Sequence, residues 1–537
     1  MWLSFKQNKA CYLMLAPFMI FFIIFTIIPV VMSLPMGFTD FNMAQAPKYI
    51  GLSNYTTLFL SDKIFIKSIR VTVVFALFTG PVSYVLCFIL AWLINELHPK
   101  LKTIFTLIFY APSMANVYTV WQLIFSGDMN GYINSFLMNL GIINSPIQWL
   151  TDGNYVLGVT IVVQLWISLG AGFLALRAGF QNIDRSMYEA GAIEGIKTRW
   201  QELIYIVIPS MGPQLMFAAV MQIVSSFTAG TVAQNLVGFP STDYRAHTIM
   251  THAYDYGWVR YEMGYASAIC MVLFVAMYAL NKLISKLLSK FMESGGREMA
   301  TQVNTMKLKA SNKQAGKKIG GTVAIFLFLT ILGLFMVLPI YLTIVMSIKP
   351  VEELFIFPPK LYAIRPTFDN FKEMFGALHQ NRVPFSRYVF NSIFVTATVT
   401  IAQCIFASMA AFVLAKCRFP GSKVINSIIV VALLYQSNVI YIMQYIVMAK
   451  LHMIDTYWAL VLPSIASPMV LFLMRQSIGQ VPDAMIEAAK VDGAGLFRIC
   501  WQIVMPNQKP ALMTLIIFAF QAAWNIQAGS VVFQEQY

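Results

Sequence analysis

Two polar stretches of similar sequence, at residues 183–209 and 481–506, lie between long apolar runs. The residues that recur at matching offsets are one glutamate, small residues and a glycine: Glu189, Ala190 and Gly195, then Glu487, Ala488 and Gly493. These residue types offer no nucleophile and no metal-binding set, but small residues let a second surface approach closely. We call the stretches the first and second repeat and interpret each as a docking surface; the alternative is a plain polar connector between membrane helices.

The spacing within each repeat predicts a short amphipathic helix. Apolar residues recur at i, i+4, i+7 and i+10, with the glutamate off that face: Ile183, Met187, Ala190 and Ile193, and Val481, Met485, Ala488 and Val491. The glycine follows the pattern directly, where helices favour a residue that accepts a left-handed backbone.

This pattern resembles the EAA loop of permease subunits of ABC importers, roughly E-A-A-x-x-x-G with an I-x-L-P ending. The second repeat fits it closely, and the first departs with Gly191, Glu194 and one additional residue before Pro209. The resemblance implies that each loop is a cytoplasmic coupling helix held by a separate ATPase subunit, which carries the ATP and Mg. It implies contacts to that subunit from Glu189, Ala190, Gly191 and Gly195, and from Glu487, Ala488, Ala489, Asp492 and Gly493.

Composition places the chain in a membrane. Of its 537 residues 58% are hydrophobic and 11% charged, against about 25% charged in soluble domains. The net charge of +14 is spread through short loops, which favours positive-inside topology over nucleic-acid binding. The six cysteines form no C-x-x-C pair, and no G-x-x-x-x-G-K-[ST] is present. We therefore expect no catalytic or metal site and no ATPase in this chain.

The apolar runs predict an all-α, polytopic fold of eleven spans, each about 20 residues long. They lie near 11–34, 68–94, 103–126, 156–179, 203–228, 264–288, 320–347, 389–415, 424–448, 456–474 and 507–527. Lys6 and Lys9 precede the first span, and loop 127–155 has no Lys or Arg. This predicts a cytoplasmic N-terminus and two cytoplasmic repeats; Lys48, Lys63 and Lys67 in loop 35–67 count mildly against it.

The chain divides into two related halves. We predict a first permease domain at 1–288, a basic cytoplasmic linker at 289–319 and a second permease domain at 320–537. The halves resemble the two permeases of maltose-type sugar importers, which implies two homologous bundles of about six helices in a bacterial cytoplasmic membrane. It also implies two ATPase subunits, an external solute-binding protein and a sugar as partners. Only residues 507–537 follow Pro506, so the second bundle is expected to lack its last helix.

The predicted spans carry neutral polar and aromatic side chains and few charges. Such groups either hold helices together by hydrogen bonds or line a path for a polyhydroxylated solute, and both roles can coexist. Our candidates for the path are Asn116, Tyr118, Trp121, Gln164, Gln222, Gln436, Asn438, Tyr441, Gln521, Trp524 and Asn525.

Two other classes of function were weighed. An ion-coupled secondary transporter can also be built from repeats, but it needs intramembrane ionisable groups, which are scarce here. A membrane-embedded enzyme would need a catalytic motif, and the sequence contains none of H-E-x-x-H or G-x-S-x-G, while its five histidines are scattered.

The topology can be tested with single cysteines at Ser186 and Ala484, in a chain without its six native cysteines. Both should resist a membrane-impermeant thiol reagent in intact cells and react after permeabilisation, because positive loops stay in the cytoplasm. Labelling of either cysteine from outside would overturn the orientation.

Overall fold

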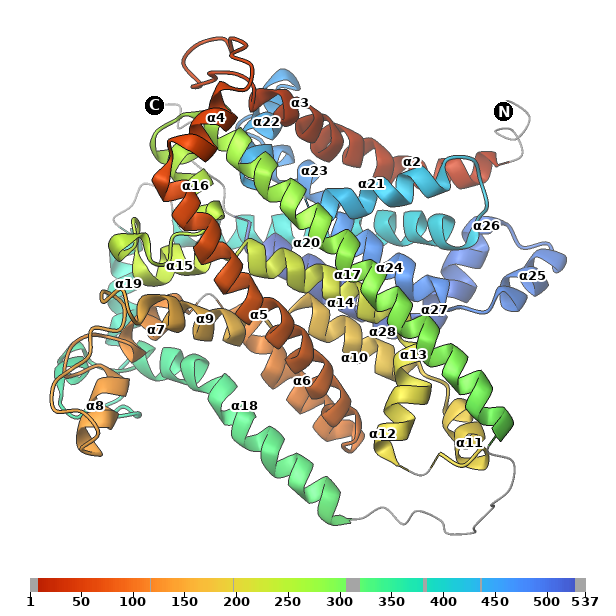
Figure 1. Ribbon diagram of the computed structural model, residues 1–537, viewed down its shortest axis with the longest axis horizontal. Helices are drawn as coiled ribbons and strands as arrows, with labels where there is room; N and C mark the ends of the chain where they lie inside the picture. Colours follow the sequence, from red (N-terminus) through yellow and green to blue (C-terminus); the bar gives the residue numbers. More distant parts are fainter. Residues whose placement is uncertain are drawn as a thin grey trace. The chain divides into compact units, whose positions relative to one another are not determined.

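The computed structural model describes residues 8–115, 117–196, 198–305, 319–379, 384–434 and 437–526. It does not describe the side chains at 185, 291–305, 319–322, 355, 377–379, 434 and 437–442. Within these residues the regular structure consists of helices joined by loops, with one isolated antiparallel bridge between Thr39 and Tyr49 (Figure 1). The all-α class predicted from the sequence is confirmed.

The helices up to the predicted linker are α2 (Lys9–Phe22), η1 (Ile23–Ile27), α3 (Ile28–Met36), α4 (Ser53–Leu60), α5 (Lys63–Asn95), α6 (Pro99–Met114), α7 (Tyr118–Ile124), α8 (Tyr132–Asn139), α9 (Val156–Ile167), α10 (Ala171–Asn182), α11 (Arg185–Ile193), α12 (Arg199–Glu202), η2 (Leu203–Val207), α13 (Ile208–Ser210), α14 (Gly212–Phe227), α15 (Gly230–Val237), η3 (Thr242–Tyr244), α16 (Ile249–Tyr254), η4 (Asp255–Val259) and α17 (Met263–Thr305).

The remaining helices are α18 (Ile319–Ser347), η5 (Val351–Phe355), α19 (Asp369–His379), α20 (Phe385–Lys416), α21 (Ser422–Leu434), α22 (Ser437–Lys450), α23 (Trp458–Ile465), α24 (Pro468–Gly479), α25 (Asp483–Val491), α26 (Leu496–Arg498), η6 (Ile499–Val504), α27 (Met505–Asn507) and α28 (Lys509–Trp524).

Seven helical segments in the described residues are long and apolar enough to cross a membrane, or up to ten if each of three bent pairs is one span. The seven are Lys9–Met36, Lys63–Asn95, Val156–Asn182, Met263–Lys290, Val323–Ser347, Phe385–Lys416 and Trp458–Gly479. Each coincides with a predicted span. The span predicted at 424–448 falls on α21 and α22 and includes residues 435 and 436, which lie outside the described residues, so it stays a prediction.

The span predicted at 203–228 falls on a bent helix pair, one of three such pairs in the described residues. Arg199–Ser210 and Gly212–Phe227 are bent by 82° against each other, and Leu496–Asn507 and Lys509–Trp524 are bent by 92°. In both places a π-helical turn precedes a proline, Pro209 or Pro506. Proline has no N–H for the carbonyl four residues earlier and its ring collides with that carbonyl. The wider π turn accommodates the proline, and the chain then changes direction.

The described residues separate into two compact units that do not follow the order of the chain. One contains residues 1–61, 253–278 and 385–537, and the other contains 62–252 and 279–384. The first span of each sequence half therefore packs with core helices of the other half. The domain boundaries predicted at 288 and 320 divide the chain by sequence order, whereas these units are defined by packing. The boundaries therefore stay a prediction.

In the first unit, α2 packs on α20 and α3 packs on α22. Gln444 donates to the carbonyl of Phe25 (2.7 Å) and Tyr12 to that of Pro420 (3.1 Å). Phe25 lies in a buried cluster with Met448, Met453 and Ala459. These contacts join residues about 400 positions apart, and they hold the N-terminal span against the second half.

In the second unit, α18 packs on α5, α6 and α7. The Trp166 indole N–H donates to the carbonyl of Met336 (3.1 Å), and the rings of Phe105 and Phe326 meet edge to face. The first span of the second half is thus held by helices of the first half.

Candidate functional site

The two repeats fold into the same local structure. The helices α11 and α25 both end in a glycine with a left-handed backbone, Gly195 at φ +97° and Gly493 at φ +79°. After α11 the N–H of Gly195 bonds the carbonyl of Ala192 (3.3 Å) and the N–H of Ile196 that of Gly191 (2.9 Å). After α25 the N–H groups of Gly493 and Ala494 make the two corresponding bonds, both 3.0 Å. This Schellman arrangement confirms the predicted role of glycine at the helix end.

The start of α11 is also fixed locally. The Asp184 carboxylate accepts a hydrogen bond from the backbone N–H of Ser186 (3.0 Å), which caps the helix. The same N–H holds the pKa of Asp184 below its usual value, because it stabilises the ionised form.

Each repeat turns a small residue inward. Gly191 and Ala489 are buried at equivalent positions. A Cβ at Gly191 would lie 2.7 Å from Ile206 Cδ1 of η2, so the side chain of Ile206 would have to move. Cδ1 is the far end of a flexible side chain, so an alanine here would require only a small shift of Ile206.

The C-terminal part of the predicted apolar face is exposed in both repeats, whereas Val481 at the start of the second face is buried. Ile193 and Val491, at matching positions, are each 88% exposed. Trp200 lies nine residues before Pro209, and Phe497 lies nine residues before Pro506. Their side chains are 65% and 60% exposed. Two helices of one chain therefore present the same apolar pattern to the outside. Exposed apolar surface of this kind marks a site of interaction.

The glutamates are exposed beside this face. Among the described residues, neither Glu189 nor Glu487 forms a hydrogen bond or an ion pair, and both are solvent-accessible. Ala190, Ala488, Asp492 and the two glycines are exposed as well. The structure brings the residues of each repeat together on one short helix and its C-terminal turn, while their role in ATPase coupling stays a prediction.

One ion pair connects each repeat to a long core helix. Lys416, the last residue of α20, lies with its side chain 7% exposed and binds the carboxylate of Asp483 at 2.7 Å. Its ammonium also donates to the backbone carbonyls of Gly479 (3.1 Å) and Val481. It thereby joins the end of α24 to the start of α25. The ammonium of Lys416 keeps the pKa of Asp483 below its usual value.

The first repeat is connected differently. Arg199 of α12 forms an ion pair with Glu96, which follows α5 directly. The rings of Trp200 and Trp92 pack at 5.2 Å between centroids. The contact is therefore made after the repeat helix rather than before it.

The path residues predicted in the first half use their amides between helices. Gln164 of α9 donates to the Ser225 hydroxyl of α14 (3.1 Å). Gln222 of α14 donates to Cys87 Sγ and to the carbonyl of Ser168, both at 3.3 Å. These contacts are the interhelical bonds that were one of the two alternatives for such residues.

The remaining path residues are placed variously. Trp121 is buried against Trp166 (5.4 Å), and Tyr118 begins α7. Gln521, Trp524 and Asn525 lie at the end of α28, where Trp524 lines a cavity. Asn116 and Gln436 lie outside the described residues, as do the side chains of Asn438 and Tyr441. The described candidates fall in both units, and their role in a substrate path stays a prediction.

A second cavity, of about 700 Å³, lies between α5, α14 and α17. Gln222, Tyr84 and Ser226 are among its lining residues, and most of the others are aliphatic. Such a lining suits an apolar guest better than a polyhydroxylated solute.

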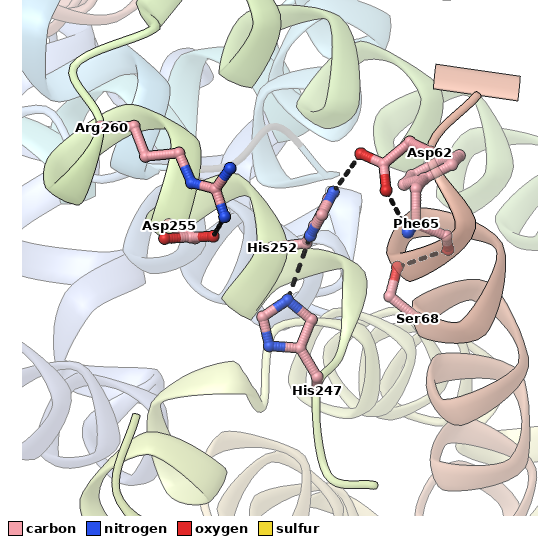
Figure 2. A network of polar contacts seen from close by, with 7 residues as sticks. All are labelled: Asp62, Phe65, Ser68, His247, His252, Asp255 and Arg260. Atoms are coloured by element: carbon pink, nitrogen blue, oxygen red, sulfur yellow. Dashed lines mark hydrogen bonds and ion pairs between the residues drawn. The ribbon is translucent and has the colours of Figure 1, made fainter. Parts of the chain in front are cut away.

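Asp62, His252 and His247 form a buried chain of polar contacts. The sequence analysis did not predict it, because the histidines are scattered along the sequence. His252 Nε2 lies 2.9 Å from Asp62 Oδ2, and His247 Nε2 lies 3.1 Å from His252 Nδ1 (Figure 2). An ionised carboxylate only accepts, so His252 donates through Nε2. Which of the two rings donates in the bond between His252 and His247 depends on their tautomers. The sequence signal was Asp62 directly before the long helix α5, which it caps through the N–H of Phe65 (2.9 Å).

Comparison with known proteins gives a consistent result. Residues 83–294 and 374–530 match the family described as the binding-protein-dependent transport system inner membrane component. The probable ABC transporter permease protein YesP of Bacillus subtilis (strain 168) is 30% identical over 302 residues, which are 55% of this chain and 94% of that protein. The arabinooligosaccharides transport system permease protein AraP of the same strain is 26% identical over 296 residues, 55% of this chain and 93% of that protein.

Among solved structures, a bacterial alginate ABC transporter in complex with alginate pentasaccharide-bound periplasmic protein is 24% identical, with a TM-score of 0.42. The match covers 56% of this chain and 98% of that chain.

Replacing Lys416 with Met should loosen α25. The change removes the cation that joins the carbonyls of Gly479 and Val481 to the carboxylate of Asp483. We expect a lower thermal midpoint and faster hydrogen exchange over 483–491. The exposed Lys423 serves as the control, and Lys423→Met should change neither; equal effects of both variants would contradict the anchoring role.

The pH dependence of this contact has a definite sign. Because the folded pKa of Asp483 lies below its ordinary 3.8, the stabilisation is present above that value and is lost as the pH falls through the lower, folded pKa. The difference in thermal midpoint between wild type and Asp483→Asn should therefore stay constant from pH 8 to 5 and disappear only under strongly acidic conditions.

Asp62→Ala should lower the thermal midpoint clearly more than Asp62→Asn. Alanine removes the cap of α5, worth about 1 kcal/mol, and leaves the buried His252 N–H without an acceptor, worth a further ~1–3 kcal/mol. Asparagine keeps only one of the two acceptors, because its amide nitrogen can only donate, so it should lie between wild type and alanine. Equal midpoints for the two variants would show that the buried chain contributes nothing.

Proposed function

Since the chain belongs to the inner-membrane components of binding-protein-dependent transport systems, we propose that it supplies both halves of the sugar path of an ABC importer. The chain is a multi-pass inner-membrane permease, and ATP hydrolysis is the task of a separate subunit. Two separate segments match the family, and relatives align over more than nine-tenths of their own length with about half of this chain. Both findings support two permease domains fused in one chain, at 1–288 and 320–537, joined by a linker at 289–319.

The observation that carries the proposal is the outward apolar face shared by the two repeats. Ile193 and Val491 are exposed to the same extent, next to an exposed glutamate and a glycine-terminated helix end. Contacts within the described part of the permease do not cover these two similar apolar patches, and exposed apolar patches indicate a binding partner. Two equivalent ATPase subunits, each with one groove, would cover both. We therefore propose α11 and α25 as coupling helices that dock into two ATPase subunits, where ATP and Mg are bound.

The ion pairs suggest how motion is transmitted. When two ATPase subunits close on ATP, α11 and α25 are drawn together. Lys416 then pulls on the end of α20 through Asp483, and Arg199 pulls on the end of α5 through Glu96. Since both α5 and α20 are long helices, their rotation would convert an inward-open path to an outward-open one. A solute-binding protein outside the cell delivers the substrate in this scheme.

A sugar or oligosaccharide is the proposed substrate. One relative is named for arabinooligosaccharides, and another, 27% identical over 232 residues, is the lactose transport system permease protein LacF of Rhizobium radiobacter. The polar amides and aromatic rings of the spans suit a neutral polyhydroxylated solute. We do not retain an ion-coupled secondary transporter as an alternative, because the family belongs to binding-protein-dependent transport systems.

The coupling role is tested by Gly493→Val. At φ +79° a β-branched residue costs roughly 1–2 kcal/mol, which corresponds to about a 5- to 30-fold change in an equilibrium. We expect the ATPase subunit recovered with the purified chain to fall by that factor, with membrane insertion unchanged and sugar uptake abolished. Gly195→Val should act in the same direction more mildly, because the longer loop after Gly195 absorbs part of the strain.

Gly493→Asn is the matched control, since asparagine tolerates the left-handed region and nothing lies within 4 Å of the position in this chain. It should retain most of the ATPase and the uptake. Uptake is measured with the sugar whose import is lost on deleting the gene, taken from a labelled panel that includes arabinotriose and lactose. Normal recovery and uptake in both valine variants would refute the coupling role, and a deletion that loses no sugar would refute the substrate class.

A further inference from the structure

A cavity of about 470 Å³ lies in the unit that contains the second half, where α20, α23 and α28 end or begin. It is lined by the first two turns of α20, by the turn before α23 and by the last turn of α28. A volume of this size lies within the range of small-molecule sites. Val395, Leu460 and Ala523 contribute apolar surface to it.

Aromatic side chains of the cavity are held in place before any ligand arrives. Trp524 stacks on Phe520, with ring centroids 5.7 Å apart and planes 13° from parallel. Tyr457 packs edge to face against Phe394 at 5.3 Å, and its hydroxyl donates to Asn391 Oδ1 at 2.7 Å. Rings fixed in this way can bind a flat apolar face without losing further side-chain freedom.

The polar groups of the lining are of the kinds that bind hydroxyls. Asn391 uses its amide oxygen for Tyr457, which leaves its amide N–H groups to donate. Arg387 forms no ion pair or hydrogen bond with the described part of the chain. Asp455 adds a carboxylate, so the lining holds one cation and one anion and carries no net charge. Donors and acceptors beside aromatic faces match a sugar ring, whose hydroxyls both donate and accept and whose C–H face is apolar.

The cavity and the repeat lie at opposite ends of one helix. Arg387 and Asn391 are in the first two turns of α20, and Lys416, which binds Asp483 next to α25, is its last residue. At 1.5 Å per residue the 32 residues of α20 are about 48 Å long, enough to cross a bilayer. If α25 faces the cytoplasm, the cavity lies on the external side.

We propose that this cavity binds one sugar ring of the transported saccharide at the external end of the second half, with Trp524 as the platform and Arg387, Asn391 and Asp455 as hydroxyl ligands. This inference rests on the proposed sugar-import function. A saccharide arriving from a binding protein would meet this site before the path through the spans. The site therefore sets the affinity of uptake and leaves the coupling to the ATPase unchanged.

The test compares two exposed tryptophans at helix ends. Trp524→Ala removes the platform, while Trp458→Ala removes a tryptophan that adjoins Tyr457 in sequence and does not line the cavity. Both are made in the full chain with its ATPase, and uptake is measured with the sugar lost on gene deletion. Trp524→Ala should raise the apparent KM about 3- to 10-fold with maximal uptake within twofold, and Trp458→Ala should leave KM unchanged. Asn391→Ala should raise KM as well.

Two further measurements distinguish the loss of the sugar site from misfolding and from loss of coupling to the ATPase. Trp524→Phe keeps an aromatic face and should restore most of the affinity, and all variants should retain the normal amount of membrane protein and of recovered ATPase. An unchanged KM in both Trp524→Ala and Asn391→Ala, or an equal rise in Trp458→Ala, would overturn the site while the importer function stands. A deletion that loses no sugar uptake would overturn the function and the site with it.

Discussion

The ammonium of Lys416 is the interaction on which the second repeat depends. A helix leaves its last carbonyls without internal partners, and the chain between α24 and α25 has no regular structure to satisfy them. One nearly buried cation meets the last carbonyl of α24, the carbonyl of Val481 in the following turn and a carboxylate at once. Its position at the very end of α20 means that the repeat cannot move without moving, or breaking from, a helix long enough to cross the bilayer. In the proposed mechanism this joint would pass the movement of the ATPase to α20.

The two halves meet the same mechanical requirement with different residues. The second half uses a lysine on the core helix and an aspartate on the repeat, whereas the first uses Glu96 beside the core helix and Arg199 after the repeat. The local fold of the repeats is nevertheless identical in its glycine end and its π turn. The two repeats thus share their exposed helix end and differ in their internal attachment. The Gly191 that departs from the family pattern belongs to this internal side, since Ile206 fills the space of a Cβ.

Particular elements show where sequence patterns were sufficient. Seven predicted spans appear as helices because about 20 apolar residues leave a chain in lipid no other way to satisfy its backbone. The bend of 82° within the span predicted at 203–228 was not foreseen, because hydropathy does not register direction; it lies where Gly212 stands between Pro209 and Pro213. Of the predicted path residues, Gln164 and Gln222 proved to bind neighbouring helices, since an amide in a span looks the same whether it faces a path or a partner.

The sequence by itself determined the membrane class, the two repeats, their glycine-terminated helices and the need for an external ATPase, because each follows from local composition or from backbone angles that only certain residues adopt. Tertiary structure alone decided which helices are neighbours. The first span of each half packs with the other half, and Asp62, His252 and His247 form one buried chain across 190 positions. Spans that are apolar on all sides carry no mark of the face they will bury. Their partners emerge only when the whole chain is packed, and so do the cavity beside Trp524 and the joint at Lys416.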